Sequence, residues 1–240
     1  MTSRRSLLAA SLLLCAAACH RAARPVTPQG AIRSGEEAAA HVAARDVDTR
    51  TLRATFKLVL RRPDGSKEAS RGAVVVARPD RLRLQIFSFG VVTAYDYTAN
   101  GERYRIREPL SGAQRVGRFD AAGDEGDVLG DDLRPLFLAP MPSAAPAVRD
   151  GGDRYLVASQ SPEGRRIAEV SKRSGAIERE TLLVGDSPRL VIEYGDFRDV
   201  DGVSMPFAID VTLPGRGVSL AVAVSRYVRN VPVDAGLFEF

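Results

Sequence analysis

The sequence predicts a mainly β fold with an α lid, in which a curled antiparallel sheet or incomplete β-barrel is covered by helices. From residue 52 onward, apolar and polar residues alternate in short runs that are separated by Gly, Pro and Asp turn signals, as in an antiparallel meander. A sheet of so many strands must curl or close. Helical patterns before the first strand and midway along the series can cover its concave face.

Each predicted strand ends at a recognisable turn. Pro63-Asp64-Gly65 follows the first strand, and Asn100-Gly101 is a strong two-residue hairpin signal. Gly215-Arg216-Gly217 is best interpreted as another hairpin turn. The expected strands cover residues 52–60, 69–77, 82–86, 91–99, 103–107, 114–119, 154–159, 166–172, 177–184, 189–194, 205–213 and 218–228.

Two segments carry helical signals. Ser34 and Glu37 form a capping-box pattern that predicts a helix start, and this helix should run to about Ala44. The sheet pattern breaks again over residues 120–150, where four apolar residues fall on one helical face and Pro135 kinks or divides the segment. These four residues are Leu129, Leu133, Leu136 and Phe137.

The N-terminus has the order of a signal peptide. Two arginines precede the apolar run Leu7–Leu14, and three alanines stand before Cys19. The run is too short to span a bilayer, which requires ~20 residues. The order resembles a bacterial lipobox, although Ala16 replaces the usual leucine. We therefore expect a signal peptide over 1–18, a lipid on Cys19, a lipidated tether over 19–33 and one domain over 34–240. The alternative is a soluble secreted protein whose two cysteines are incidental.

Composition restricts the functional classes. Hydrophobic residues make up 45% of the chain, enough for one core, and the mature chain retains no cysteine pair for a disulfide. Loss of Arg4 and Arg5 with the signal peptide lowers the formal charge from +4 to +2, which argues against nucleic acid as a partner. Weak attraction to an anionic membrane surface is the most that this charge suggests.

The sequence contains no recognisable catalytic constellation. His20 and His41 are the only histidines, and neither has a partner at metal-ligand spacing. The acidic cluster Asp124, Glu125, Asp127, Asp131 and Asp132 does not match an EF-hand loop and is better interpreted as a solvated face. We predict no enzyme activity, no metal and no cofactor beyond the covalent lipid on Cys19. A hydrolytic carboxylate pair stays open, but nothing in the sequence singles one out.

Four motifs occur in an order that resembles a known family. They are the strand–Arg-Pro–strand run 72–84, the segment Ile86–Gly90, the closing Met205-Pro206-Phe207 and the terminal 235–240 with its Phe-x-Phe. Together they resemble the lipoprotein-localisation factors LolA and LolB over residues 34–240. The resemblance implies an incomplete antiparallel barrel with a helical lid, and a hydrophobic cavity that holds the acyl chains of lipoproteins.

The resemblance also implies roles for individual residues. Arg78 matches an arginine that holds the lid closed, although it could equally be a surface residue before a turn. Phe89 matches an exposed leucine that inserts into a membrane, and the alternative is that it folds back into the core. The expected cavity residues are Leu52, Phe56, Leu58, Leu82, Leu84, Ile86 and Tyr95 from the sheet, with Leu133 and Phe137 from the lid.

Location and partners follow from the same resemblance. His20 follows the cysteine where Asp would signal retention in the inner membrane, so the lipid anchor is expected on the periplasmic face of the outer membrane. The expected partners are acylated lipoproteins or lipids, the membrane itself and a periplasmic carrier protein. The anchor favours a LolB-like receptor, whereas Arg78-Pro79 and the terminal Phe-x-Phe look more like the carrier. The alternative function is a structural or scaffold lipoprotein of an envelope assembly with no lipid cargo.

Overall fold

One large sheet dominates the protein. The computed structural model describes residues 30–45, 47–88, 92–119, 137–138, 145–161 and 164–240, and within them thirteen antiparallel strands form a single sheet. The strands are β1 (Thr51–Arg61), β2 (Lys67–Ala77), β3 (Arg81–Ser88), β4 (Val92–Asn100), β5 (Arg103–Glu108), β6 (Ala113–Arg118), β7 (Ala147–Asp150), β8 (Arg154–Ser161), β9 (Gly164–Ser171), β10 (Ile177–Val184), β11 (Ser187–Val200), β12 (Val203–Leu213) and β13 (Val218–Arg229).

Two meanders meet in the middle of this sheet. The strand order is β6-β5-β4-β3-β2-β1-β13-β12-β11-β10-β9-β8-β7. The first and last strands therefore pair with each other, with Leu52 opposite Arg229 and Arg61 opposite Ser219. β6 and β7 end the series on either side, so the sheet is not closed into a barrel.

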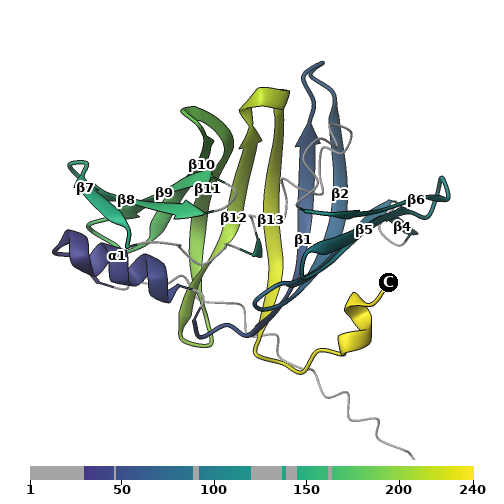
Figure 1. Ribbon diagram of the computed structural model, residues 1–240, viewed down its shortest axis with the longest axis horizontal. Helices are drawn as coiled ribbons and strands as arrows, with labels where there is room; N and C mark the ends of the chain where they lie inside the picture. Colours follow the sequence, from purple (N-terminus) through teal and green to yellow (C-terminus); the bar gives the residue numbers. More distant parts are fainter. Residues whose placement is uncertain (1–29, 46, 89–91, 120–136, 139–144, 162–163) are drawn as a thin grey trace, which may run out of the picture.

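The sheet is strongly curved. In Figure 1 the central strands stand upright, while β4–β6 on one side and β7–β9 on the other lie across them. We call the face that carries the side chains of Leu52, Phe56 and Leu58 the inner face, and the opposite face the outer face. The main hydrophobic core lies on the inner face, where the alternating apolar residues of β1 to β5 meet those of β10 to β13.

The alternation predicted twelve of the strands, and the structure confirms all twelve. Some of these strands begin or end at other residues than predicted. β11 is longer than expected, because it continues from the predicted segment to Val200. β7 was missed and lies within the segment where the sheet pattern was expected to break. Its four residues are all exposed, so no apolar alternation marks it. The turn at 215–217 is confirmed as part of a short 3-10 turn, η1 (Pro214–Arg216), between β12 and β13.

The predicted first helix is confirmed as α1 (Gly35–Ala44), and the Ser34 side chain accepts a hydrogen bond from the Glu37 amide. As expected, α1 covers part of the inner face. It packs against β7 and β8 at one end of the sheet (Figure 1), where Ala38 belongs to one cluster with Val157 and Ala168. Ile32, expected in the tether, is buried and belongs to a second core cluster beneath α1. No helix among the described residues is long and apolar enough to span a membrane.

The expected lid segment is described only in part. Phe137 and Leu138 are placed, and both pack with the main core; residues 120–136, including Leu133, lie outside the described residues. The end of the chain forms a second 3-10 turn, η2 (Ala235–Phe238), which packs on β3 and β4. Phe238 is buried there, and Arg83 and Asn100 donate hydrogen bonds to backbone carbonyls of this segment.

Candidate ligand-binding cavity

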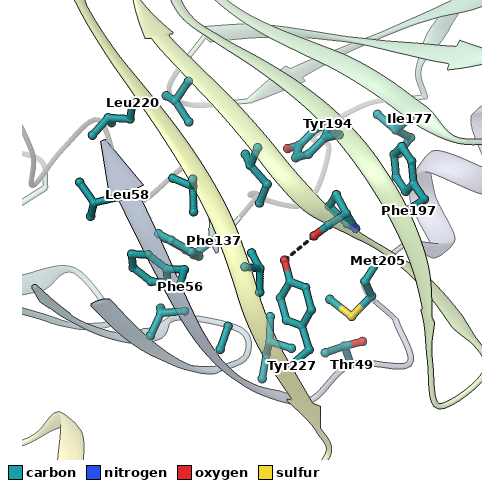
Figure 2. Close-up of a pocket in the computed structure, with 18 of the residues that line it drawn as sticks. Thr49, Phe56, Leu58, Phe137, Ile177, Tyr194, Phe197, Met205, Leu220 and Tyr227 are labelled. Atoms are coloured by element: carbon teal, nitrogen blue, oxygen red, sulfur yellow. Dashed lines mark hydrogen bonds between the residues drawn. The ribbon is translucent and has the colours of Figure 1, made fainter. Parts of the chain in front are cut away.

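The inner face of the sheet lines a partly open cavity of about 800 Å³. This volume lies in the upper part of the ~300–1,000 Å³ range of small-molecule sites. Side chains from β1–β4 and from β10–β13 line the cavity, and Figure 2 shows several of them pointing into the same space. The cavity is therefore built at the junction of the two meanders.

β1 forms one long wall of the cavity. Five of its residues point inward at every second position, as the period-2 pattern requires: Leu52, Ala54, Phe56, Leu58 and Leu60. From Leu52 to Leu60 this wall runs about 26 Å, at about 3.3 Å per residue. One leaflet of a bilayer core is only ~15 Å thick, half of ~30 Å. The wall is thus long enough to lie along an extended acyl chain.

The cavity lining continues onto strands that the sequence analysis did not assign to the cavity. Val222 of β13 lies beside its register partners Leu58 of β1 and Ile209 of β12, and all three line the space. The alternation Leu220, Val222, Val224 is visible in the sequence. It could not be assigned to the cavity without knowing that β13 pairs with β1.

Most of the expected cavity residues that are described line the cavity. These residues are Leu52, Phe56, Leu58, Leu84, Ile86, Tyr95 and Phe137. Figure 2 shows Phe137, from the segment between the two meanders, among the residues that line this space. Leu82 is a correction: it lies on the inner face but is fully buried in the packed core, away from the cavity lining. Leu133 lies outside the described residues.

A glycine in β2 makes room for one aromatic wall residue. A Cβ atom on Gly72 would lie 2.4 Å from Cζ of Phe56 and 2.9 Å from the backbone oxygen of Gln85. The phenyl ring of Phe56 therefore occupies the space that a side chain at residue 72 would fill. Only glycine allows this close approach.

We expect Gly72→Val to lower the free energy of unfolding by about 2–3 kcal/mol, because Phe56 and the backbone of β3 cannot both move aside. Urea unfolding followed by circular dichroism measures the change. Ala73→Val is the matched control, since the neighbouring side chain lies on the outer face. Equal stability of the Gly72 variant and this control would show that the contact is not tight.

A buried arginine, Arg229, links two loops by hydrogen bonds at one end of the cavity. The Arg229 guanidinium donates hydrogen bonds to the Thr49 hydroxyl at 2.9 and 3.1 Å and to the Val200 carbonyl at 3.3 Å. It also reaches the carbonyls of Asp48 and Asp201. These bonds join the α1–β1 connection to the turn between β11 and β12. A guanidinium suits this task because it presents five donors in a fixed plane.

Arg78 lies at the same end and lines the cavity. Its backbone amide donates to the Arg50 carbonyl at 2.9 Å, next to the start of β1. The expected contact of Arg78 with a lid stays a prediction. Cys19 and Phe89 lie outside the described residues, so lipidation and membrane insertion also stay predictions. β3 ends at Ser88 and β4 begins at Val92, toward the end of the sheet where β1 turns into β2.

A charged cluster lies buried beside the cavity, below α1. The Glu180 carboxylate contacts Arg45 at 3.0 Å and Arg166 at 3.4 Å, and it accepts a hydrogen bond from the Tyr194 hydroxyl at 2.7 Å. Burial raises the pKa of Glu180, but the two arginines and the tyrosine outweigh it, so that the pKa is lowered. The pKa of nearby His41 is lowered by burial and by the charge of Arg45. This cluster fastens the end of α1 to the sheet.

The remaining chemistry of the cavity is mainly apolar. The Tyr227 hydroxyl is occupied by a hydrogen bond to the Pro206 carbonyl at 2.8 Å (Figure 2), and burial raises its pKa. Within the part of the chain that the structure describes, no three His, Cys, Asp or Glu side chains lie close enough to hold a metal ion. The arrangement suits a long apolar ligand whose polar group stays near an end of the cavity.

Comparison with known proteins identifies the fold. No family model and no curated protein sequence matches the chain. Among solved structures, a LolA superfamily protein from Nitrosomonas europaea matches with a TM-score of 0.63 at 8% identity, covering 87% of this chain and 99% of that one. A domain from Vibrio parahaemolyticus assigned to outer membrane lipoprotein sorting matches with a TM-score of 0.62 at 11% identity, covering 85% and 97%.

A third match is a DUF1329 family protein from Desulfovibrio piger, with a TM-score of 0.62 at 13% identity, covering 87% of this chain and 98% of that one. The coverage shows that the likeness extends over nearly the whole of each solved chain. The chain therefore has a LolA-like fold, as its sequence motifs suggested. At such low identity the likeness establishes the fold alone.

Proposed function

We propose that this protein is an outer-membrane lipoprotein that binds the acyl chains of lipoproteins or lipids in its cavity and serves lipoprotein localisation. The observation that carries the proposal is the cavity of about 800 Å³, which is lined by the long apolar wall of β1 and by Val222 and Ile209 on the neighbouring strands. The LolA-like fold supports it. The lipid anchor on Cys19 and the periplasmic face are the parts that rest on sequence.

The physical need for such a cavity is large. Burial of one CH₂ group contributes ~0.8 kcal/mol, so a palmitoyl chain exposed to water represents roughly 12 kcal/mol. A lipoprotein with several chains therefore requires a shielded site while it moves between membranes. The protein has only to bury the chains reversibly and release them, so no bond is made or broken.

Binding of an acylated peptide tests the proposal directly. The mature chain without its lipid, residues 20–240, contains every described strand and is titrated with a fluorescent diacylated lipopeptide. Saturable binding that the unacylated peptide does not reproduce is the expected result. A folded protein that binds neither peptide would contradict the proposal and favour a scaffold role without lipid cargo.

The second part of the proposal assigns Phe89 to delivery. An exposed aromatic side chain on the 89–91 loop would enter the bilayer interface as chains leave the cavity. We expect Phe89→Glu to leave lipopeptide affinity within about twofold but to slow transfer from the protein to vesicles about tenfold, because a carboxylate resists entry into lipid. Fluorescence transfer to vesicles measures the rate, with Phe89→Leu as control. Unchanged transfer by the Glu variant would remove Phe89 from the mechanism.

A further inference from the structure

The small net charge of the chain conceals an uneven distribution. Cations collect on the outer face of β13, β1 and β2, on the side of the sheet opposite the cavity. Six exposed side chains form this group, which we call the basic face: Arg53, Lys57, Arg61, Lys67, Arg71 and Arg226.

The register places like charges directly against each other. Lys57 of β1 lies opposite Arg71 of β2, and Arg61 lies opposite Lys67. Like charges at directly opposed positions of a sheet are destabilising. Among the described residues, no carboxylate lies within ion-pair distance of any of the six. The fold alone gives no reason for this arrangement, and an anionic ligand would.

The other half of the outer face is balanced. On β8 to β11 the cations have acidic neighbours, with Arg154 2.7 Å from Glu169 and Arg179 3.7 Å from Glu193. The excess of positive charge is therefore local to β13, β1 and β2 and is not a general property of the surface.

The basic face lacks the features of a protein interface. Such interfaces centre on buried aromatic or large aliphatic anchors. The described residues with exposed large hydrophobic side chains all lie elsewhere, and none is on β1, β2 or β13. Between the cations stand small residues such as Thr55, Ala73 and Ala223. The basic face extends about 26 Å from Arg53 to Arg61, at about 3.3 Å per residue. It has no large apolar side chain among the described exposed residues that could insert into a pocket of a partner protein.

We propose that the basic face docks the protein on the headgroups of anionic phospholipids. Three of its cations, Arg61, Lys67 and Arg71, lie toward the end of the sheet where β3 stops at Ser88 and β4 starts at Val92. A headgroup layer that contacts them also approaches the cavity residues Leu60 and Leu220 at that end. Contact with the membrane and access to the cavity then occur on one end of the molecule.

Vesicle flotation tests this docking with the unlipidated chain 20–240, so that no anchor contributes. Binding to vesicles of phosphatidylcholine with 30% phosphatidylglycerol should exceed binding to pure phosphatidylcholine and fall as salt is raised. Each cation removed should weaken binding about fivefold. Lys57→Gln/Arg71→Gln should therefore lose roughly 25-fold. The matched control is Arg165→Gln/Arg189→Gln, which removes two exposed cations from the outer face of β9 and β11.

The outcomes separate this inference from the acyl-chain proposal. Loss of vesicle binding in the Lys57/Arg71 variant, with binding retained in the control and lipopeptide affinity unchanged in both, would support docking through the basic face. Equal binding of the native chain to neutral and anionic vesicles would overturn it, and so would equal losses in the two double variants. An acidic protein as the true partner would appear as absence of vesicle binding even at low salt.

Discussion

Replacing Val222 with Trp is expected to lower the affinity for an acylated lipopeptide about fiftyfold while the protein stays folded. Val222 lies at the centre of β13, between Leu58 of β1 and Ile209 of β12 on the same face of the sheet, and all three line the cavity. An indole at this position occupies space that an acyl chain would fill. Each methylene kept out of the cavity costs ~0.8 kcal/mol, so the exclusion of roughly three methylenes accounts for the fiftyfold loss.

Thr212→Trp provides the matched control. Thr212 is exposed on the outer face of β12, so the same indole is added to the same part of the sheet without entering the cavity. Lipopeptide titration of both variants, with circular dichroism to check folding, decides the point. If both variants keep the native affinity, the acyl chains do not bind over β1 and β13 on the inner face, and the function proposed for the cavity is wrong.

The strands were predictable because alternation is a local property. Apolar residues at every second position and Gly, Pro or Asn at the turns identified twelve strands. The pairing of β1 with β13 was not predictable, since the two strands are far apart in sequence and no local pattern encodes it. β7 was not predicted for a different reason. All four of its residues are exposed, so no alternation of apolar and polar residues marks an inner face.

The site was predictable only on its first wall. Leu52, Phe56 and Leu58 were found because β1 alternates clearly, and they line the cavity. Leu82 follows the same pattern on β3 but lies in the packed core, because alternation identifies a face and cannot locate a void within it. Val222 and Ile209 could be assigned only once β13 was known to pair with both β1 and β12.

The positions of charged residues in the fold could not be predicted from local sequence either, as two examples show. The total of +2 for the mature chain suggested only weak attraction to a membrane, yet register places Lys57 against Arg71 and concentrates cations on one face. The sequence also gave no sign that a charged pair would be buried. Glu180 and Arg166 are 14 residues apart on different strands, and nothing in their local sequence separates them from solvated residues.

The buried carboxylate leads to the second large expected effect. Glu180→Gln should lower the free energy of unfolding at pH 7 by about 3 kcal/mol, because it leaves the buried Arg166 without its anionic partner. Side-chain exposure of Glu180 is 3% and that of Arg166 is 9%, so water cannot readily replace the lost charge. Arg45, which also contacts Glu180, would release the end of α1, and the packing of α1 on β7 and β8 should loosen.

The pH dependence separates this effect from a general packing defect. The pKa of Glu180 is lowered in the folded state, whereas an unfolded glutamate titrates near ~4.3. The contribution of Glu180 is therefore fully present above about pH 4.3 and is lost as the pH falls through the folded-state value. The stability difference between the native chain and Glu180→Gln should be largest at neutral pH and should shrink on acidification. Urea unfolding between pH 7 and pH 3 measures it, with Glu178→Gln as the neighbouring control. A difference that stays constant across this range would mean that the carboxylate charge does not hold α1 to the sheet.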